Sequence, residues 1–589
     1  MEASTLFING VIQKNTLLRI PYFQRRYVWK EDNWNRFAID MESTLDSERN
    51  YFLGALILKE DTVTKADKML GIGKKQLVID GQQRLTTLCI FMKVLHMMVA
   101  KNDDFANQYL QTTNEQSPVL IHSRDDIAPF SKIMTLDTPK EVVDQSNIVK
   151  AYDYFLKYLS ARKKEGVNLE ALLNTINSSV TFVVISLKNE DDEQQIFDTI
   201  NSLGVPLTTG ELLKNFLYEE NDEEAYRTNW RTMFDTDEAR EFWEADSSKS
   251  RQSKTNKENR TIERFFHAFV RIKMWDFKNQ LTDAQRKEFV KMENVFTTCK
   301  AFVNTFGMEK QDLANEIIDY AKLFKENLND GILETRIPQH ACIKRISCFI
   351  NATKNYAVIP YVLYILHEVK DENERNRIFD YLESYLIRRV LAGSKNNNYS
   401  DLFTENLISN RIKSFEKFKK WIDEREDSSL ALPQLSKVKL GMTTNTIDDI
   451  SSRIVFYLYE TKLNKTSEPN ALDGGFNDYY TDGLMPKLAK TKDSPNWPRY
   501  RQDSAKEEKR QMLIGTLGNF FLLENGGKKD MRKNLDALCG IKVGIMTKWA
   551  DKIRSSKNML QNLTSWTEDD IKRRNDELAR IFCENIWTV

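Results

Sequence analysis

The segment VIDGQQRLTTL, residues 78–88, combines residue types that suit phosphate binding. Gly81 permits a tight turn, and a helix that starts at Gln82 has unpaired backbone N–H groups in its first turn. These groups and the positive end of the helix dipole favour an anion, and Arg84 adds a charged fork that matches a phosphate. Asp80 would bind a metal or orient water. The competing interpretation is that Asp80 caps the helix and Arg84 forms a surface ion pair.

A second cluster, IPYFQRRYVW at residues 20–29, combines polar and aromatic side chains. Its Gln24, Arg25 and Arg26 stand between four aromatic residues: Tyr22, Phe23, Tyr27 and Trp29. We expect the aromatic rings to anchor this loop in the core. The Gln and Arg side chains would then face the same pocket as the turn at Asp80.

The elements around these clusters are typical of an α/β domain over residues 1–220. β-branched and apolar runs predict strands at residues 17–23, 51–58, 76–80 and 178–187. Apolar residues after Gln82 recur at helical spacing, which predicts a helix there. Asp80 and Gly81 therefore occupy a strand-to-helix turn.

The rest of the chain is expected to be mostly helical, so the predicted fold class is α+β. Residues 221–440 show helical periodicity and no strand cluster. A third domain, 441–589, opens with a helix near Thr446 and closes with a helix from Thr567 to Trp587. The opening helix is expected to bury one stripe of four residues: Ile447, Ile450, Ile454 and Leu458.

The amino-acid composition excludes several classes of protein. The 589 residues contain 86 basic and 86 acidic residues, only 12 Pro and 21 Gly, and six scattered Cys without a CxxC pair, which argues against disorder, a disulfide framework and a zinc site. No apolar run approaches the ~20 residues of a membrane span, and we expect a cytoplasmic protein. Residues 486–589 hold 21 basic against 14 acidic residues. This positive excess indicates either a surface that binds the phosphate backbone of a nucleic acid or an ordinary solvated surface.

Four segments in this order resemble one family. IPYFQRRYVW, YFLGALIL, VIDGQQRLTTL and FDTINSLGVPLTTGELLKN are similar to the N-terminal domain of GmrSD- and SspE-type type IV restriction proteins, which act in anti-phage defence. The resemblance implies a ParB/sulfiredoxin-like fold with NTP binding and NTPase activity at the DGQQR motif. By this match the nucleotide site comprises Gln24, Arg25, Asp80, Gly81, Gln82, Gln83 and Arg84, with Asp80 and Arg84 catalytic. Asn201, Gly204 and Leu207 of the fourth segment are expected to be architectural.

The C-terminal domain resembles the nuclease domain of the same family, a ββα-metal, HNH-like (His-Me finger) module. The matching segments are DGLMP at 482–486, Trp497 with Arg499, and LGNFFLLEN at 517–525. The resemblance implies a Mg²⁺ or Mn²⁺ site at Asp482, Asn519 and Asn534, with Asn519 also catalytic. Gly483, however, stands where the family has its catalytic His.

No histidine follows His367 in this chain, so another C-terminal His cannot take that place. Loss of a general base typically costs 10²- to 10⁴-fold in rate. We therefore expect an impaired nuclease, in which restoring a histidine by Gly483→His would restore cleavage. Loss during evolution and a substitution introduced to trap an uncut complex both explain Gly483.

The leading interpretation is a nucleotide-regulated restriction protein that recognises modified or foreign DNA. Basic residues after the candidate nuclease strands are the expected DNA contacts: Lys528, Lys529, Arg532 and Lys533. The alternative is a non-enzymatic module in which a nucleotide switches DNA binding or recruitment of a partner nuclease. A homo-oligomer or a partner defence protein is compatible with both interpretations.

Overall fold

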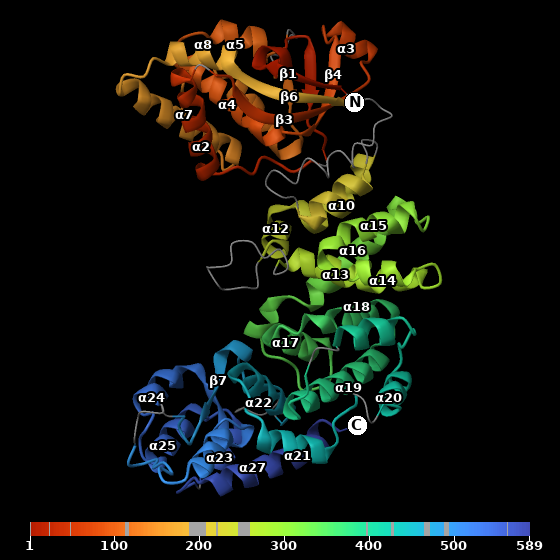
Figure 1. Ribbon diagram of the computed structural model, residues 1–589, viewed down its shortest axis with the longest axis vertical. Coiled ribbons are helices and arrows are strands. Elements are labelled where there is room, and N and C mark those ends of the chain that lie inside the picture. Colours follow the sequence, from red (N-terminus) through yellow and green to blue (C-terminus); the bar gives the residue numbers. More distant parts are fainter. Residues whose placement is uncertain are drawn as a thin grey trace. The chain divides into compact units, whose positions relative to one another are not determined.

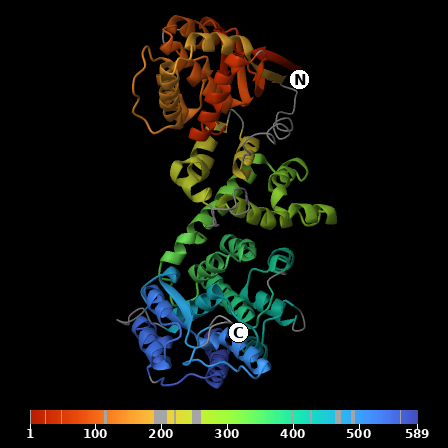
Figure 2. The same cartoon turned by 60° about the vertical axis from the view of Figure 1, so that its left-hand side comes forward.

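A computed structural model shows a chain of two compact units, residues 1–239 and residues 240–589 (Figures 1 and 2). The structure describes residues 2–22, 24–47, 49–111, 117–187, 208–218, 222–245, 260–395, 399–425, 429–463, 472–487, 494–561 and 563–588. Helix α12 (Asp237–Trp243) runs across the boundary between the units.

The N-terminal unit is built on a six-stranded mixed sheet with the order β1-β6-β3-β4-β2-β5. Strand β3 pairs in parallel with β6 and antiparallel with β4, and β4 pairs in parallel with β2. The strands are β1 (Glu2–Phe7), β2 (Thr16–Arg19), β3 (Tyr51–Glu60), β4 (Lys74–Asp80), β5 (Leu120–Ile121) and β6 (Val180–Leu187).

Helix α4 (Gln82–Met98) lies at the centre of this unit. Its apolar residues, among them Leu85, Leu88 and Phe91, are fully buried and pack in one core with side chains of the surrounding helices and the sheet. The other helices of the unit are α1 (Ile8–Val11), α2 (Glu31–Ser43), α3 (Lys65–Met69), α5 (Asn102–Tyr109), α6 (Ile127–Met134), α7 (Asn147–Lys164), α8 (Leu169–Ser179), α10 (Thr209–Leu217) and α11 (Glu223–Ala225). Because α4 continues directly from β4, the core fixes the turn between them.

Sequence patterns predicted most of this sheet. The four expected strands correspond to β2, β3, β4 and β6, and the helix after Gln82 is confirmed. The patterns missed β1, whose residues are mostly exposed and which pairs antiparallel with β6, and the two-residue β5. The expected architectural residues Asn201, Gly204 and Leu207 lie outside the described residues.

The second unit is mostly helical. Its helices are α13 (Thr261–Lys273), α14 (Asp283–Phe289), α15 (Val295–Asn304), α16 (Lys310–Asn327), α17 (Ile343–Thr353), α18 (Ile359–Glu368), α19 (Glu372–Leu391), α20 (Phe415–Asp423), α21 (Leu435–Thr444), α22 (Asp449–Leu463), α23 (Ser504–Ile514), α24 (Lys528–Lys533), α25 (Cys539–Trp549), α26 (Arg554–Leu560) and α27 (Glu568–Arg580). Within the described residues 240–440 there is no strand, as expected.

Two short strands interrupt the helices near the C-terminal end. Strand β7 (Tyr479–Gly483) pairs antiparallel with β8 (Phe520–Glu524), with Gly483 opposite Phe520. Helix α22 packs against both strands. Residues before and after 440 belong to the same compact unit, and the three-domain division at 220 and 440 stays a prediction.

A buried ion pair joins distant parts of the second unit. The Arg345 guanidinium donates to both carboxylate oxygens of Glu383, at 2.7 and 2.8 Å, and both side chains are buried. The Trp587 indole N–H donates to the same carboxylate at 2.7 Å. This network ties the end of the chain to α17 and α19.

The opening helix of the expected third domain differs in detail from its prediction. α22 begins at Asp449, and Ile454 and Leu458 are fully buried as expected, whereas Ile450 is 41% exposed. The last predicted helix is α27 followed by a wider helical turn, Ile581–Ile586. Among the described helices, none is long and apolar enough to cross a membrane.

Candidate functional site

Gly81 makes the turn between β4 and α4. Its φ of 92° lies in the left-handed region, and a β-carbon there would lie 2.9 Å from Leu56 Cδ1 and 3.0 Å from the Ala55 carbonyl oxygen. Only glycine fits both the backbone conformation and this close approach to β3. No side chain caps the first turn of α4, so the expected capping role of Asp80 is absent.

The three glutamines connect the two sequence clusters. Gln82 donates its amide to Gln24 Oε1 at 3.2 Å, and Gln24 donates to the Ile79 carbonyl at 3.2 Å. Gln83 accepts from the Val28 backbone N–H at 2.9 Å and donates to the Arg26 carbonyl at 3.1 Å. The structure therefore brings the loop at 24–28 against the turn, and these amides serve to hold it there.

Tyr27 anchors the same loop in the core. Its buried hydroxyl lies 2.6 Å from Thr87 Oγ1 and accepts from the Trp34 indole N–H at 2.9 Å. Its backbone N–H donates to Asp126 at 2.7 Å. Burial, the largest influence, raises the pKa of Tyr27, so the hydroxyl stays protonated. The anchoring role expected for the aromatic residues is confirmed for Tyr27, while Phe23 lies outside the described residues.

Arg84 is held by both β3 and Asp80. Its guanidinium donates to the Ala55 carbonyl at 2.7 Å and lies 3.4 Å from the Asp80 carboxylate. Gly54, with a φ of +127°, makes room for it, because a β-carbon there would fall 2.0 Å from Arg84 Nη1. Arg84 therefore does form an ion pair, as the competing interpretation expects. Its partner is Asp80, which is itself a candidate site residue.

Two guanidinium groups influence one carboxylate in this turn. Burial raises the pKa of Asp80, and the positive charges of Arg84 and Arg25 oppose that rise. Arg25 has no hydrogen-bond or ion-pair partner among the described residues. Two cations against one anion leave an excess positive charge beside the uncapped start of α4, which suits a phosphate.

The second candidate site is a cavity of about 850 Å³ at the end of β7. Asp482, Gly483 and Asn519 all line it, as the resemblance implies. Burial raises the pKa of Asp482, an effect that the positive charge of Lys542 opposes. The missed neighbour is Asp449, at the start of α22, which lines the same cavity and raises the pKa of Asp482 further. The sequence TIDDI before a helix was the only signal for it.

Asn519 is fully engaged by protein groups. Its Oδ1 accepts from the Met485 backbone N–H at 2.9 Å and from the Trp566 indole at 3.1 Å. Its Nδ2 donates to the carbonyls of Met485 and Ile514, at 2.8 and 2.9 Å. These four hydrogen bonds satisfy the amide, so this geometry favours a positioning role.

The predicted metal ligands are brought together only in part. Asp482 and Asn519 line one cavity, whereas the Asn534 side chain donates to the Asp530 carbonyl at 2.9 Å and does not line it. The described part of the chain holds no group of three or more His, Cys, Asp or Glu side chains that fits a metal ion. The metal site that the resemblance implies stays a prediction, since Mg²⁺ is commonly held by only one or two carboxylates together with water and substrate phosphates.

Lys542 braces the end of β7 from within. Its fully buried ammonium donates to the Gly483 carbonyl at 3.2 Å and to the Leu535 carbonyl at 3.3 Å. Burial lowers its pKa to about 8, although the nearby Asp482 carboxylate acts in the opposite direction. In the sequence Lys542 is one of the 21 basic residues of 486–589, and nothing in the pattern around it indicates that it is buried.

Helix α24 carries the four predicted DNA-contacting residues. Lys528, Lys529, Arg532 and Lys533 are all exposed, and none has an ion pair among the described residues. Lys528 lies 5.3 Å from the ring centre of Tyr480 in β7, and Arg532 lowers the pKa of Asp482 electrostatically. The helix therefore places unpaired positive charge close to the cavity.

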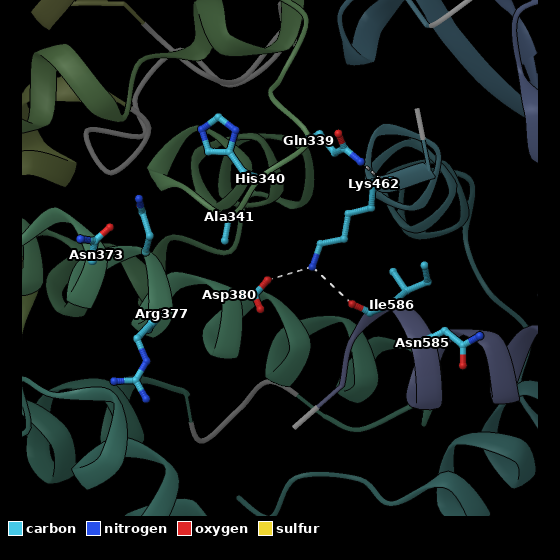
Figure 3. Close-up of a pocket in the computed structure, with 10 residues that line it drawn as sticks. Gln339, His340, Ala341, Asn373, Arg377, Asp380, Lys462, Asn585 and Ile586 are labelled. Atoms are coloured by element: carbon cyan, nitrogen blue, oxygen red, sulfur yellow. Dashed lines mark hydrogen bonds and ion pairs between the residues drawn. The ribbon is translucent and has the colours of Figure 1, made fainter. Parts of the chain in front are cut away.

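A second cavity of about 570 Å³ lies where α19, α22 and the C-terminal segment meet (Figure 3). Its central cation, Lys462, donates to Asp380 at 2.9 Å and to the Ile586 carbonyl at 3.4 Å. Gln339 in turn donates to the Lys462 carbonyl at 3.0 Å. The polar groups at its centre thus join four segments of the chain, which contribute Gln339, Asp380, Lys462 and Ile586.

Comparison with known protein families finds a match in the N-terminal part of the chain. Residues 7–218 match the family model described as GmrSD restriction endonuclease, N-terminal domain. The match includes the turn at Asp80 and the loop at 24–28, and it supports a GmrSD-type restriction-protein N-terminus. No curated protein matches the chain.

Proposed function

We propose that this protein is a nucleotide-regulated restriction protein of anti-phage defence that acts on modified or foreign DNA. The carrying observation is the match of residues 7–218 to the GmrSD N-terminal domain together with the geometry of its most distinctive motif. In that motif Arg25 and Arg84 both act on Asp80 beside the start of α4. The N-terminal fold is proposed to be ParB/sulfiredoxin-like.

The proposed ligand of the N-terminal turn is a nucleoside triphosphate. Arg25 would bind a phosphate oxygen, and the backbone N–H groups at the start of α4 would donate hydrogen bonds to the same anion. Gly81 lets backbone approach β3, and the glutamines hold the Arg25 loop in place. Hydrolysis at this turn, with Asp80 orienting water, is part of the same proposal.

Isothermal titration with ATP, GTP, CTP and UTP tests the nucleotide site. Arg25→Ala should abolish binding, because the proposed phosphate contact of the guanidinium is lost. It should leave the fold intact, because this guanidinium has no hydrogen-bond or ion-pair partner among the described residues. Arg36→Ala is the control, since Arg36 is an exposed arginine of the same unit. Equal affinity of parent and Arg25→Ala would contradict the assignment.

The C-terminal module is proposed to be HNH-like, to bind duplex DNA through α24 and to have an impaired nuclease centre. Charge reversal of Lys528, Lys529, Arg532 and Lys533 to Glu should weaken binding and lower the log–log salt slope by about 0.9 for each lost phosphate contact. Lys291→Glu/Lys322→Glu is the control, because both lysines are already paired with acidic neighbours. An unchanged slope in anisotropy would show that α24 is only a solvated surface.

The alternative function is a non-enzymatic switch in which nucleotide binding controls DNA binding or recruitment of a partner. The glycine at position 483 and the four hydrogen bonds that occupy the Asn519 amide favour it. Plasmid nicking in Mg²⁺ or Mn²⁺ distinguishes the two functions, because the switch binds DNA without cutting it.

A further inference from the structure

Three large aliphatic side chains stand exposed within the short stretch 535–541, and the first of them, Leu535, lines the C-terminal cavity. Leu535, Leu538 and Ile541 are 38%, 56% and 51% exposed, and they fall within seven residues of one another. Leu538 immediately precedes α25, and the Ile541 backbone N–H donates to the Leu538 carbonyl at 3.0 Å. Single exposed leucines are ordinary, but three together beside a cavity are typical of a contact surface.

This apolar turn is attached to the candidate nuclease strand. The buried Lys542 ammonium bridges the carbonyls of Leu535 and Gly483, at 3.3 and 3.2 Å. The Leu535 side chain itself lines the cavity together with Asp482 and Gly483. The apolar turn is therefore continuous with the cavity at Leu535.

The positive charge of α24 beside the apolar turn favours a ligand that carries phosphates. Helix α24, immediately before it in the chain, presents exposed cations that have no ion pair among the described residues. Figure 1 shows α24, α25 and β7 in the same part of the second unit. Cations that contact phosphates, followed by aliphatic side chains that contact bases, are the combination found in proteins that kink a duplex.

We propose that Leu535, Leu538 and Ile541 form an apolar wedge that enters a step between base pairs of the duplex held by α24. The wedge rests on the proposed DNA binding and adds a way of reading DNA by deformability. It would unstack one step and present the deformed backbone to the cavity at Asp482. Easily unstacked pyrimidine–purine steps would then be preferred.

Fluorescence of 2-aminopurine tests the wedge in the full chain. A duplex with 2-aminopurine at a TA step should brighten on binding, because unstacking relieves quenching of the base. Leu538→Gln/Ile541→Gln should remove this increase and weaken binding about tenfold, while the salt slope stays the same. Leu538→Phe should retain the increase, which separates a lost wedge from a misfolded protein.

Leu440→Gln is the matched control, since Leu440 is a 62% exposed leucine on another helix, α21. Binding with a normal salt slope but without brightening would overturn the wedge and leave the proposed function standing. No binding by the parent protein would overturn both. The wedge is also overturned if the Gln variants change only self-association in sedimentation, or only binding to anionic phosphatidylserine vesicles.

Discussion

The side-chain amide of Asn519 lies where a β-carbon on Gly483 would be placed. That β-carbon would fall 2.6 Å from Asn519 Nδ2 and 3.2 Å from the Met485 carbonyl oxygen. Asn519 does not move freely, because four hydrogen bonds hold its amide. Gly483 is therefore part of the packing of this turn as well as the position of the missing histidine.

We expect Gly483→Ala to lower the free energy of unfolding of the second unit by about 1–3 kcal/mol, the usual cost of overpacking. Gly544→Ala is the control, because a β-carbon at Gly544 in α25 meets nothing within 4 Å. It should stabilise the protein by about 0.4–1 kcal/mol. Urea denaturation of the two variants measures the difference, and equal stability would show that Asn519 yields easily.

Gly483→His should not by itself restore metal-dependent cleavage. The structure revises the expectation from sequence alone, because the new side chain would displace Asn519 and with it the Met485 backbone. Plasmid nicking in Mg²⁺ or Mn²⁺ checks this, with Gly483→Ala as the variant that has the same crowding without an imidazole. Cleavage by Gly483→His alone would contradict the prediction, and cleavage by the parent would identify another base.

The position of Arg84 should depend on Gly54. Gly54→Ala adds a β-carbon 2.0 Å from the guanidinium at a left-handed φ, so we expect loss of stability and weakened nucleotide binding. Gly71→Ala is the control, because Gly71 also has a positive φ, of +78°, with a backbone cost of about 1–2 kcal/mol, and a β-carbon there meets nothing within 4 Å. Thermal melts and nucleotide titration of both variants test this. Equal effects would show that Arg84 adapts to the crowding.

Arg84→Ala should lower stability as well as nucleotide binding. Loss of its hydrogen bond leaves the Ala55 carbonyl without that donor, at a cost of about 1–3 kcal/mol. This prediction differs from that for Arg25→Ala, which should affect binding alone. A melting curve of Arg84→Ala that overlays that of the parent would contradict it.

Stability of the second unit should fall in acid because of Glu383. Burial alone would raise the pKa of this carboxyl, but Arg345 and Lys462 lower it to about 2, from an ordinary value of 4.5. A lowered pKa contributes stability above 4.5 and loses it as the pH falls towards 2. Urea denaturation between pH 5 and pH 2, at roughly half-unit steps, measures this loss.

Glu383→Gln supplies the control for that pH dependence. It should flatten the acid limb and cost about 3–5 kcal/mol, because Arg345 keeps its charge in the core without a partner. The double variant Arg345→Met/Glu383→Leu should cost less than the single one, since it does not leave Arg345 charged and without its carboxylate in the core. An unchanged acid limb in Glu383→Gln would assign the pH dependence to other carboxylates.

Parts of the candidate sites could be predicted because they are formed by residues that are close together in the sequence. A buried strand, a glycine and an amphipathic helix in sequence predict the turn at Gly81, and the structure has it there. The joining of the 24–28 loop to the turn was also anticipated. Gly54, Asp126 and Asp449 were missed, because each reaches its site from another segment of the chain.

The sequence by itself determined the local elements: strands 51–60 and 180–187, the helix after Gly81 and the helical character of residues 260–395. Apolar periodicity and a glycine turn depend on only a few neighbouring residues, so they can be recognised in the sequence without knowledge of the tertiary structure. Only the tertiary structure decided that the polar, exposed β1 is a strand, because its partner β6 lies about 180 residues away along the chain. It also decided that Asn519 is saturated and that Lys542 is buried, since hydrogen-bond partners and burial depend on long-range packing.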